Sequence, residues 1–480
     1  MKGDVPLYEG REKKCMSRLI INPVTRIEGH AKITIDIDDD GKVSNGHLHV
    51  LEIRGFEKLL EGMELFRMPL ITARICGVCP AAHHMAAVTA IENGLGVTVT
   101  DTAKKLRELM YMGHILHSHA LSTFVLAGPD ILLGLDAPHE HRNIFELLKL
   151  KPEASRKMLR LRSIGQKVVE IVGGRGVHPV TSVPGGLASA PSEEEMSSMA
   201  RWGAEAVELL HEVNDIITEN LKKLEGVRNS LDIPFSSMAL SDNGEVTYFQ
   251  APCAVMNSSG VIDTVFEAED YVSHLIEQPM YGSYMKSVRL RKENSSFYVG
   301  PMARLNVNSR FSTKVADGLL KEYRNAKHPR TSALDFVEAR LIEMVHCAER
   351  ITELASSGAD GNLMVETTPR AGVFIGMVEA PRGILIHEYR ADDDGIITAA
   401  NLIVATQNNY MAIDRCITGV ASEHAVSGDD ELFLSSVEFS LRCFDPCLAC
   451  ATHSTGRMPM TVDVRKNGKT VREVRRGGRP

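Results

Sequence analysis

Apolar and polar residues alternate most regularly near the start of the chain. The segments KITIDID (32–38) and VSNGHLHVLEI (43–53) have a period of two, and the turn-forming run DDDG at 38–41 separates them. This alternation predicts antiparallel strands, so we expect a β-meander over residues 19–55. The acidic run lacks the twelve-residue ligand spacing and terminal glutamate of a calcium loop, and we interpret it as a solvated turn. The run DDDG at 392–395 has the same interpretation.

Three later segments have helical periodicity instead. Apolar residues from 102 to 127 recur at the spacing of a long, largely buried helix. Residues 192–228 begin with Ser192 and carry Glu195 three positions later, which is the pattern of a capping box before a long helix. A further helix with one apolar stripe is expected to begin near Ser332.

The helix expected at 102–127 carries three closely spaced histidines. They are His114, His117 and His119, and by spacing only the first two share a face. A metal site is one interpretation, but no carboxylate or thiolate accompanies them on that face. We therefore favour histidines that pack in the core or at an interface.

The segment 229–310 is richer in glycine, serine, asparagine and strand-forming residues than its neighbours, which predicts a β-rich or irregular lobe on a helical body. The glycines of GGRG at 173–176 follow a helix-like stretch rather than a strand, so we expect a turn there and no dinucleotide-binding loop. Together these patterns predict an α+β fold that is mainly helical, with a core of long helices, an N-terminal β-meander and smaller β lobes.

Composition and charge exclude several classes of protein. Of the 480 residues, 44% are hydrophobic and 24% charged, which is typical of a globular protein. The net charge is −8, and no sustained basic block precedes the last 25 residues, so a nucleic-acid partner is not expected. No stretch has the length and apolarity of a signal peptide core or a membrane span. Because nine cysteines are too few for a disulfide scaffold, we expect a reducing, cytoplasmic location.

Four of the nine cysteines form two CxxC pairs almost a whole chain apart. The first pair is Cys76 and Cys79, and the second is Cys447 and Cys450. In each pair two sulfurs can converge from one turn, and thiolates bind soft or borderline metals. One four-sulfur site would require the two ends of the chain to meet, which predicts a single domain over 1–453 followed by a tail at 454–480. Spacing alone leaves zinc, iron–sulfur and redox roles open.

The residues around the two pairs narrow these alternatives. RICGVCPAAHH (74–84) and DPCLACATH (445–453) together resemble the large subunit of nickel–iron hydrogenases, especially its cytoplasmic, cofactor-coupled branch. The resemblance extends to further blocks in the same order: INPVTRIEGH at 21–30, RGFE at 54–57, GGRGVHP at 173–179, EAPRG at 379–383 and NLIVATQNN at 401–409. It implies the fold of that subunit, with reversible cleavage of dihydrogen as its activity.

The resemblance assigns the metal ligands. Cys76, Cys79, Cys447 and Cys450 would hold nickel, with Cys79 and Cys450 also bridging to an iron that carries two cyanides and one carbon monoxide. Cys447 would be the first proton acceptor, and Glu28 would relay the proton. Without the surrounding TRIEGH motif, Glu28 would instead be interpreted as a cap or as the partner of Arg26 in a salt bridge.

The resemblance also implies four residues around the metals. Arg382 would lie above them, with Asp445 accepting a hydrogen bond near it. Thr406 would donate to a cyanide, and His83 would donate to a bridging sulfur. His84 is expected to be a packing or surface residue.

A second metal site is implied at the junction of the chain ends. Glu57, the carbonyl of Leu402 and His453 match a family site for a hard divalent cation, usually magnesium. The alternative for Glu57 is a surface pair with Lys58. One departure from the family is Ser122, which stands where many relatives have an active-site aspartate.

Electrons must leave through a partner, because the remaining cysteines at 15, 253, 347, 416 and 443 are too scattered to hold iron–sulfur clusters. The resemblance implies an iron–sulfur small subunit, together with further electron-transfer subunits that bind flavin or a nucleotide. The acceptor itself, whether NAD(P), a deazaflavin or a disulfide reductase, stays open. The tail predicts a hairpin around Asn467 and Gly468, and its removal would require a maturation protease and a nickel chaperone.

Two other classes compete with the hydrogenase interpretation. A noncatalytic subunit related to the quinone-site subunit of respiratory complex I would share the fold but lack the metal cysteines. A zinc-stapled scaffold would keep four thiolates but would contain zinc.

Overall fold

The computed structural model describes residues 17–21, 24–50, 55–280, 283–424, 429–448, 460–466 and 469–476. Of the residues singled out above, Cys15, Cys450, His453, Asn467 and Gly468 lie outside this described part.

The N-terminal strands form the expected meander. Strands β1 (Ser17–Ile21), β2 (Ala31–Ile37) and β3 (Val43–Val50) pair antiparallel in sequence order. The acidic run between β2 and β3 is a turn, because Asp38 Oδ1 accepts hydrogen bonds from the backbone N–H groups of Asp40 and Lys42. Asp392 closes the equivalent turn in the same way.

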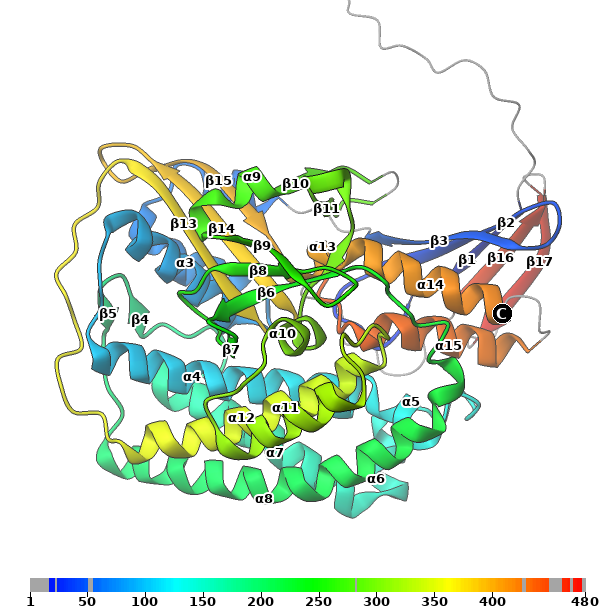
Figure 1. Cartoon of the computed structure of the whole chain (residues 1–480), viewed down its shortest axis with the longest axis horizontal. Helices are drawn as coiled ribbons and strands as arrows, with labels where there is room; N and C mark the ends of the chain where they lie inside the picture. The colour runs from blue at the N-terminus through cyan, green and yellow to red at the C-terminus, as the bar shows by residue number, and fades with distance from the viewer. Residues whose placement is uncertain are drawn as a thin grey trace, which may run out of the picture.

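Two C-terminal strands complete this sheet. Strands β16 (Met460–Lys466) and β17 (Lys469–Arg476) pair antiparallel, as the tail pattern predicts, and β16 pairs with β1. The sheet order is therefore β17-β16-β1-β2-β3, and Figure 1 shows it projecting from one end of the molecule. The tail thus adds strands to the edge of the N-terminal meander.

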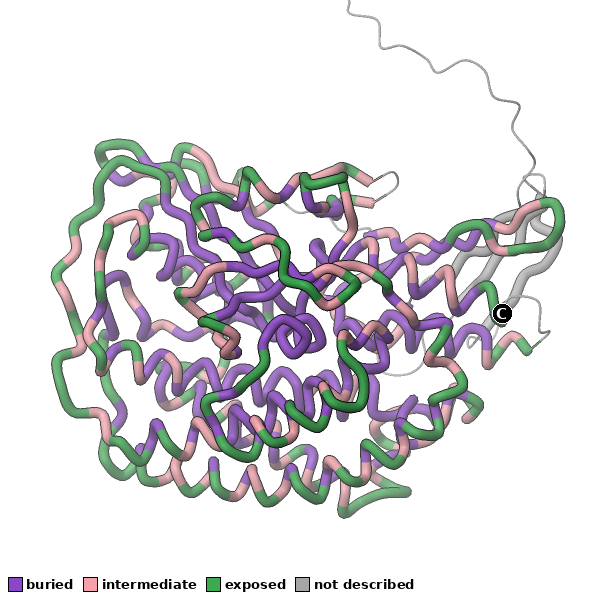
Figure 2. Tube along the Cα trace, in the orientation of Figure 1, coloured by how far each residue is buried: buried purple, intermediate pink, exposed green. Residues whose placement is uncertain are grey.

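Long helices form the body on the other side of the molecule (Figure 1). The helix expected at 102–127 is α4 (Asp101–Ala120), which continues as a π-helical segment, η3 (Leu121–Leu126). It packs against α7 (Pro152–Gly173) and α12 (Asp335–Ser356), and α12 packs in turn against α8 (Glu193–Lys223). Figure 2 shows that the inner faces of these helices are buried.

The predicted helix ends agree closely with the structure. Ser192 and Glu195 form the expected capping box at the start of α8. Gly174 ends α7 in the left-handed region, at φ 73°, so GGRG forms the expected turn. The prediction for α12 is three residues early, because Ser332 forms a β-bridge with Asp232 before the helix starts at Asp335.

The segment 229–310 is β-rich, as predicted. Its main sheet has the order β12-β6-β8-β9, and a separate hairpin pairs β10 with β11. Its strands are β6 (Ser236–Asp242), β7 (Glu245–Val246), β8 (Cys253–Met256), β9 (Ile262–Phe266), β10 (Leu275–Gln278), β11 (Ser287–Leu290) and β12 (Phe297–Tyr298).

A three-stranded sheet joins this lobe to the helices. It contains β13 (Gly372–Ala380), β14 (Gly383–Ala391) and β15 (Ile397–Ile403), all antiparallel. Helix α3 (Pro80–Leu95) packs on it closely, because Gly376 has no side chain: a Cβ there would lie 2.4 Å from the backbone nitrogen of Ala90. This close approach brings the helix after the first CxxC pair onto the strands that carry EAPRG.

Smaller elements connect these layers. After β15 come α13 (Ala405–Asn408), α14 (Tyr410–His424) and α15 (Asp430–Cys443). The others are α1 (Phe56–Leu60), η1 (Leu65–Arg67), α2 (Met68–Thr72), η2 (Ala73–Ile75), α5 (Gly128–Leu133), α6 (Ile144–Leu150), β4 (Ser182–Val183), β5 (Gly186–Leu187), η4 (Glu225–Val227), η5 (Ala268–Asp270), α9 (Tyr271–His274), η6 (Lys292–Asn294), α10 (Pro301–Val307) and α11 (Lys314–Ala326). The α+β prediction is confirmed. Among the described residues, no helix combines the length and apolarity needed to cross a bilayer.

Candidate metal centre

The first cysteine pair is organised by the start of α3. Cys76 follows η2, and Cys79 is the residue before Pro80, which occupies the first helical position. The Cys79 backbone N–H donates to Cys76 Sγ at 3.1 Å, and the two sulfurs are 2.8 Å apart. Both side chains are buried. This half of the site is therefore built almost entirely from local contacts.

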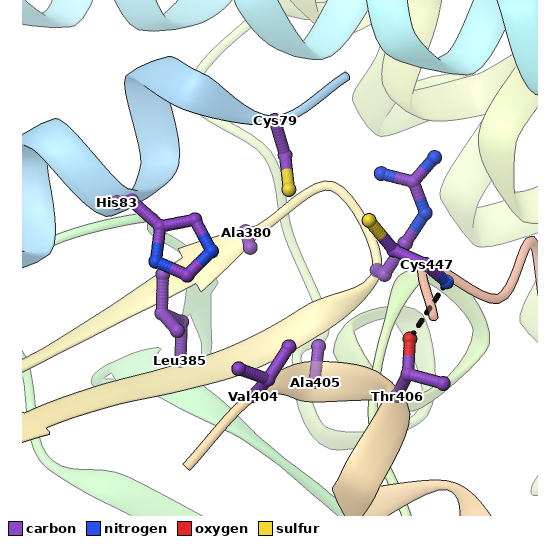
Figure 3. A pocket seen from close by; sticks show the side chains of 9 residues that line it. Cys79, His83, Ala380, Leu385, Val404, Ala405, Thr406 and Cys447 are labelled. Atoms are coloured by element: carbon purple, nitrogen blue, oxygen red, sulfur yellow. Dashed lines mark hydrogen bonds between the residues drawn. The ribbon is translucent and has the colours of Figure 1, made fainter. Parts of the chain in front are cut away.

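Cys447 reaches the first pair from the other end of the chain. Its sulfur lies 3.1 Å from that of Cys76. The backbone around it is held by two distant segments: the Leu448 N–H donates to the Glu28 carbonyl at 3.0 Å, and the Cys447 N–H donates to Thr406 Oγ1 at 3.0 Å (Figure 3). Among the described residues, Cys76, Cys79 and Cys447 form the only group of potential metal ligands whose ligand atoms all lie within 4.8 Å of one another.

The three thiols crowd together, with Cys76 and Cys79 buried and Cys447 partly buried. For Cys79, the hydrogen bond from Cys447 favours the thiolate, but its hydrogen bond to Cys76 and burial outweigh this, so the pKa of Cys79 is raised well above its usual value. The pKa of Cys447 is raised in the same way. A cation that displaces the thiol protons would remove this penalty, because a metal binds the thiolate.

Arg382 brings a permanent positive charge to the same cavity. Its Nη2 donates to Asp445 Oδ1 at 2.9 Å, which is the hydrogen bond expected from sequence. Burial disfavours the cation, but Asp445 and the cysteines outweigh this and keep the pKa of Arg382 well above its usual value. Asp445 adopts a left-handed backbone conformation, φ 53°, immediately before Pro446, a strained geometry that tertiary contacts must hold in place.

A buried ionic network that the sequence did not reveal holds the EAPRG turn. Arg304 forms a bidentate pair with Glu343 at 2.6 and 2.7 Å, and its Nη1 donates to Glu379 at 2.7 Å. The same guanidinium donates to the carbonyls of Ala380 and Pro381, the two residues before Arg382. The position of Arg382 therefore depends on α10 and α12 as well as on its own turn.

The two carboxyl groups that pair with Arg304 have different pKa values. Burial would raise the pKa of Glu343, but Arg304 outweighs burial and lowers it to about 2. For Glu379, burial outweighs Arg304 and raises the pKa to about 7. His119 donates to Glu343 at 2.7 Å, and burial lowers its pKa to about 4, so the histidine is neutral at pH 7.

A second buried network holds the segment that contains Glu28. Arg26 donates to Asp130 at 2.6 Å. Arg442 on α15 donates to Asp130 at 2.9 Å and to Glu438 at 2.8 Å. Arg442 also bonds the Thr25 carbonyl at 2.8 Å, while Glu438 accepts from Thr25. The TRIEGH segment is thereby bound to the helix that leads into the second cysteine segment.

The histidines of α3 are both buried but have different surroundings. His83 lines the cavity beside Cys79 and Cys447 (Figure 3), and its Nδ1 lies 3.1 Å from His387 Nε2 on β14. His84 points elsewhere and donates from Nδ1 to the Pro69 carbonyl at 2.9 Å. His84 is thus a packing residue, as expected. His387 was missed, although its position five residues after Arg382, as a polar residue in the apolar strand β14, could have signalled it.

The predicted site for a hard cation is only partly described. Glu57 lies on α1, which packs against β15, the strand that carries Leu402. Lys58 pairs with Glu61. The third expected ligand, His453, lies outside the described residues.

The histidines of α4 are core residues, as favoured from sequence. His114, His117 and His119 are all at least nine-tenths buried. Burial lowers the pKa of His114 well below its usual value and that of His117 to about 4. Ser122, the departure from the family pattern, is buried in the π-helical segment that follows.

The residues of the cavity fit a soft or borderline metal. The lining consists of Cys79, His83, Ala380, Arg382, Leu385, Val404, Ala405, Thr406 and Cys447. Thiolates are suitable ligands for nickel and iron, and an apolar wall with one fixed cation beside the sulfurs leaves room for small uncharged or anionic ligands. The sulfurs come from both ends of the chain, so the site exists only in the folded protein.

Comparisons with known proteins extend this picture. A family model described as nickel-dependent hydrogenase matches residues 54–139 and 233–453, and one described as HoxL-like matches residues 18–53. The chain is 36% identical to the NAD-reducing hydrogenase HoxS subunit beta of Cupriavidus necator, over 94% of this chain and 97% of that protein. It is also 36% identical to a subunit of the F420-non-reducing hydrogenase vhu of Methanocaldococcus jannaschii, over 85% of this chain and 99% of that protein.

Solved structures show the same likeness. A crystal structure of an NAD⁺-reducing [NiFe]-hydrogenase in the H2-reduced state has a TM-score of 0.87 at 34% identity, covering 92% of this chain and 100% of that chain. The Ni-Fe-Se hydrogenase from D. vulgaris Hildenborough has a TM-score of 0.75 at 25% identity, covering 91% of this chain and 100% of that chain.

Proposed function

This chain belongs to the nickel-dependent hydrogenase family as a catalytic large subunit that acts on dihydrogen, and from that premise we propose how its residues divide the work. The observation that carries the proposal is the convergence of Cys76, Cys79 and Cys447 within 4.8 Å, in one buried cavity with Arg382. With Cys450 as the fourth ligand, these thiolates would hold a nickel–iron centre. Cys79 and Cys450 would bridge to an iron that carries two cyanides and one carbon monoxide.

When bound, such a centre supplies the redox-active metal at which dihydrogen is split into a proton and an electron pair. The protein's part is to accept the proton and move it away. Cys447 is the first acceptor in this proposal, and Glu28 is the second, because the β-bridge between Glu28 and Cys447 places the two residues on adjacent backbone segments. A carboxylate can serve in such a relay, because it can accept a proton and release it again.

Three further residues serve the diatomic ligands and the sulfurs. Arg382 faces the cavity with a charge fixed by Asp445, and it would stabilise a cyanide. Thr406 Oγ1 accepts a hydrogen bond from the Cys447 backbone N–H, and its hydroxyl would donate to the other cyanide. His83 would donate to a bridging sulfur and so tune the electron density on the metals.

The wider assembly is part of the same proposal. Residues 1–453 would form one domain that receives electrons from dihydrogen and passes them to an iron–sulfur small subunit. The named relatives suggest further subunits that bind flavin or a nucleotide, and we propose a cytoplasmic location on the resemblance to that branch. Magnesium would bind Glu57, the Leu402 carbonyl and His453. If the tail at 454–480 is cleaved, the partners would include a maturation protease and a nickel chaperone.

The composition of the purified complex tests the metal centre. We expect nickel and iron, infrared bands of cyanide and carbon monoxide, and dihydrogen-dependent dye reduction. Zinc alone, or the absence of diatomic bands from matured protein, would favour the zinc-stapled scaffold instead.

Glu28→Gln tests the proton path. A glutamine keeps the shape of the side chain but cannot accept a proton, so exchange between dihydrogen and deuterated solvent should fall by about 10²- to 10⁴-fold with unchanged nickel content. Glu208→Gln, on the exposed face of α8, is the matched control and should not change exchange. Normal exchange in Glu28→Gln would remove Glu28 from the path.

A further inference from the structure

Three fully buried side chains form a hydrogen-bonded row that starts at the cavity. His83 Nδ1 lies 3.1 Å from His387 Nε2, and His387 Nδ1 lies 2.6 Å from the Tyr389 hydroxyl. Their exposed fractions are 1%, 0% and 0%. His387 and Tyr389 are two residues apart on β14, so both project from the face of the sheet on which α3 packs with His83. The row is therefore fixed by a helix and a strand rather than by loops.

The row can carry its protons in two arrangements only. In a fully buried row, desolvation disfavours even a single charged imidazole, which favours the neutral form of both rings. Each ring then has one N–H and one acceptor nitrogen. Either Tyr389 donates to His387 and His387 donates to His83, or the whole row is reversed. The first arrangement leaves the His83 proton on Nε2, and the second places it on Nδ1.

The Tyr389 hydroxyl decides between these arrangements. Burial raises the pKa of Tyr389 well above its usual value, so the hydroxyl keeps its proton and must donate it. Its two polar neighbours are His387 Nδ1 and the hydroxyl of Thr72, which itself donates to the Met68 carbonyl at 2.8 Å. An imidazole nitrogen is a far more basic acceptor than an alcohol, and at 2.6 Å the geometry favours donation to His387.

His83, which stands at the cavity end of the row, favours the same arrangement, with its proton on Nε2. Nδ1 of His83 is engaged with His387, so Nε2 is the ring nitrogen that can address the cavity. Thiolates bound to a metal have no proton and can only accept hydrogen bonds. A protonated Nε2 can therefore donate a hydrogen bond to a sulfur, whereas an unprotonated Nε2 would place two hydrogen-bond acceptors next to each other.

We propose that Tyr389 and His387 are positioning residues that hold His83 as the tautomer protonated on Nε2, so that His83 donates toward the cysteine sulfurs. Neither residue is among those that line the cavity, and no group changes its net charge. The inference rests on the proposed function, because it assigns the donor tautomer that a metal-bound thiolate requires. The donor form of His83 then depends on the Tyr389 hydroxyl, which is separated from His83 by His387.

Tyr389→Phe in the assembled heteromer removes only the first donor of the row. His387 and His83 then lose their fixed tautomers, and a sulfur that receives less hydrogen bonding donates more electron density to the iron. We expect normal nickel and iron content, with the infrared band of carbon monoxide split or moved to lower wavenumber. Tyr298→Phe is the control: this hydroxyl is also fully buried, but it bonds Ser237 and Asn306 in the β lobe, and its loss should leave the band in place.

Two substitutions of His387 separate hydrogen bonding from packing. His387→Gln retains an amide N–H that can donate to His83 Nδ1, so the carbon monoxide band should stay close to that of the wild type. His387→Leu removes the donor and should reproduce the change seen in Tyr389→Phe. If all variants that lose the donor keep the wild-type band at full metal content, the proposal is wrong.

Neutron crystallography of the wild-type enzyme reads the tautomer directly, without a variant that must fold. Deuterium on Nε2 of His83 and on the Tyr389 hydroxyl is the expected result, and deuterium on Nδ1 of His83 would overturn the proposal. A wild-type enzyme that lacks diatomic bands would contradict the proposed function instead, and the neutron result would still decide the arrangement of the row.

Discussion

The two cysteine segments reach the same cavity by opposite structural routes. Cys76 and Cys79 are placed by the start of one helix, and their hydrogen bonds span three residues. Cys447 is placed by contacts to Glu28 and Thr406, and its sulfur meets that of Cys76 across 371 positions of sequence. The first half of the site is a local structure, whereas the second exists only when the whole fold is in place.

This difference has an energetic cause. A helix start needs only a few residues in order, but closing a loop of several hundred residues has an entropic cost that local contacts cannot offset. Near Cys447, buried polar contacts join Thr25 to α15 through Arg442 and Glu438, so the second segment is held by long-range contacts.

Among substitutions near the Cys447 segment, Arg442→Met should have the largest effect. The substitution leaves Glu438 and Asp130 buried without one of their partners, which should lower the free energy of unfolding by about 3–5 kcal/mol and also reduce nickel content. Urea unfolding and metal analysis measure the two effects. Arg160→Met, which breaks a partly exposed pair with Glu205, should cost less than about 1 kcal/mol. Equal losses in the two variants would contradict a special role for the buried network.

The segment of the first cysteine pair should be more sensitive to acid than the segment of Cys447, because it contains His84. Burial lowers the pKa of His84 from 6.5 to about 4, so the unfolded chain binds its proton first and stability falls as pH drops from about 6.5 to about 4. Above that window the histidine is neutral in both states and contributes nothing to the pH dependence. By pH 4 the loss due to His84 is up to about 3 kcal/mol.

His84→Asn isolates this contribution, because asparagine can still donate to the Pro69 carbonyl but does not titrate. Its free energy of unfolding should depend less on pH than that of the wild type below pH 6.5. His141→Asn, at a histidine side chain that is 59% exposed, serves as the control. Parallel pH profiles for the wild type and His84→Asn would show that His84 is protonated at little cost.

The smallest effect should come from Thr406→Val, which removes one acceptor from the second half. The part-buried Cys447 N–H then has no partner at Thr406, a loss of about 0.5–1.5 kcal/mol. We expect faster loss of nickel to a chelator and a decrease in the free energy of unfolding no larger than this. Thr313→Val, at a buried threonine that bonds His346 far from the cavity, should not change the rate of nickel loss. Similar rates in the two variants would indicate that Glu28 alone holds the segment.

Sequence patterns predicted the elements of the fold well where the signal is local. The capping box at Ser192, the turn after Gly173 and the alternation of β2 and β3 each depend on a few adjacent residues, and all are present. The start of α12 was placed too early because Ser332 is recruited into a β-bridge by Asp232, a contact across the fold. Helix propensity depends on the local sequence and therefore cannot predict a competing contact across the fold.

The candidate site divides in the same way. Cysteines in CxxC pairs and the residues of EAPRG stand out as motifs, so the sequence could single out Cys447 and Arg382. Arg304 and Tyr389 do not stand out, because an arginine in a helix and a tyrosine in a strand ordinarily need no special explanation. Their importance follows from what lies opposite them in the folded chain: the carbonyls before Arg382 in one case and the ring of His387 in the other.

By itself, the sequence predicted the candidate ligand sulfurs, the helical and β-rich segments, and the requirement that residues near 76 and 447 meet. Covalent spacing and side-chain chemistry are enough for those conclusions. Only the tertiary structure decided which surroundings those ligands have: Arg26 pairs with Asp130, Arg304 holds the turn before Arg382, and His83 ends a row that begins at Tyr389. Hydrogen bonds and burial act between atoms that are close in space, and in this fold such atoms come from distant parts of the chain.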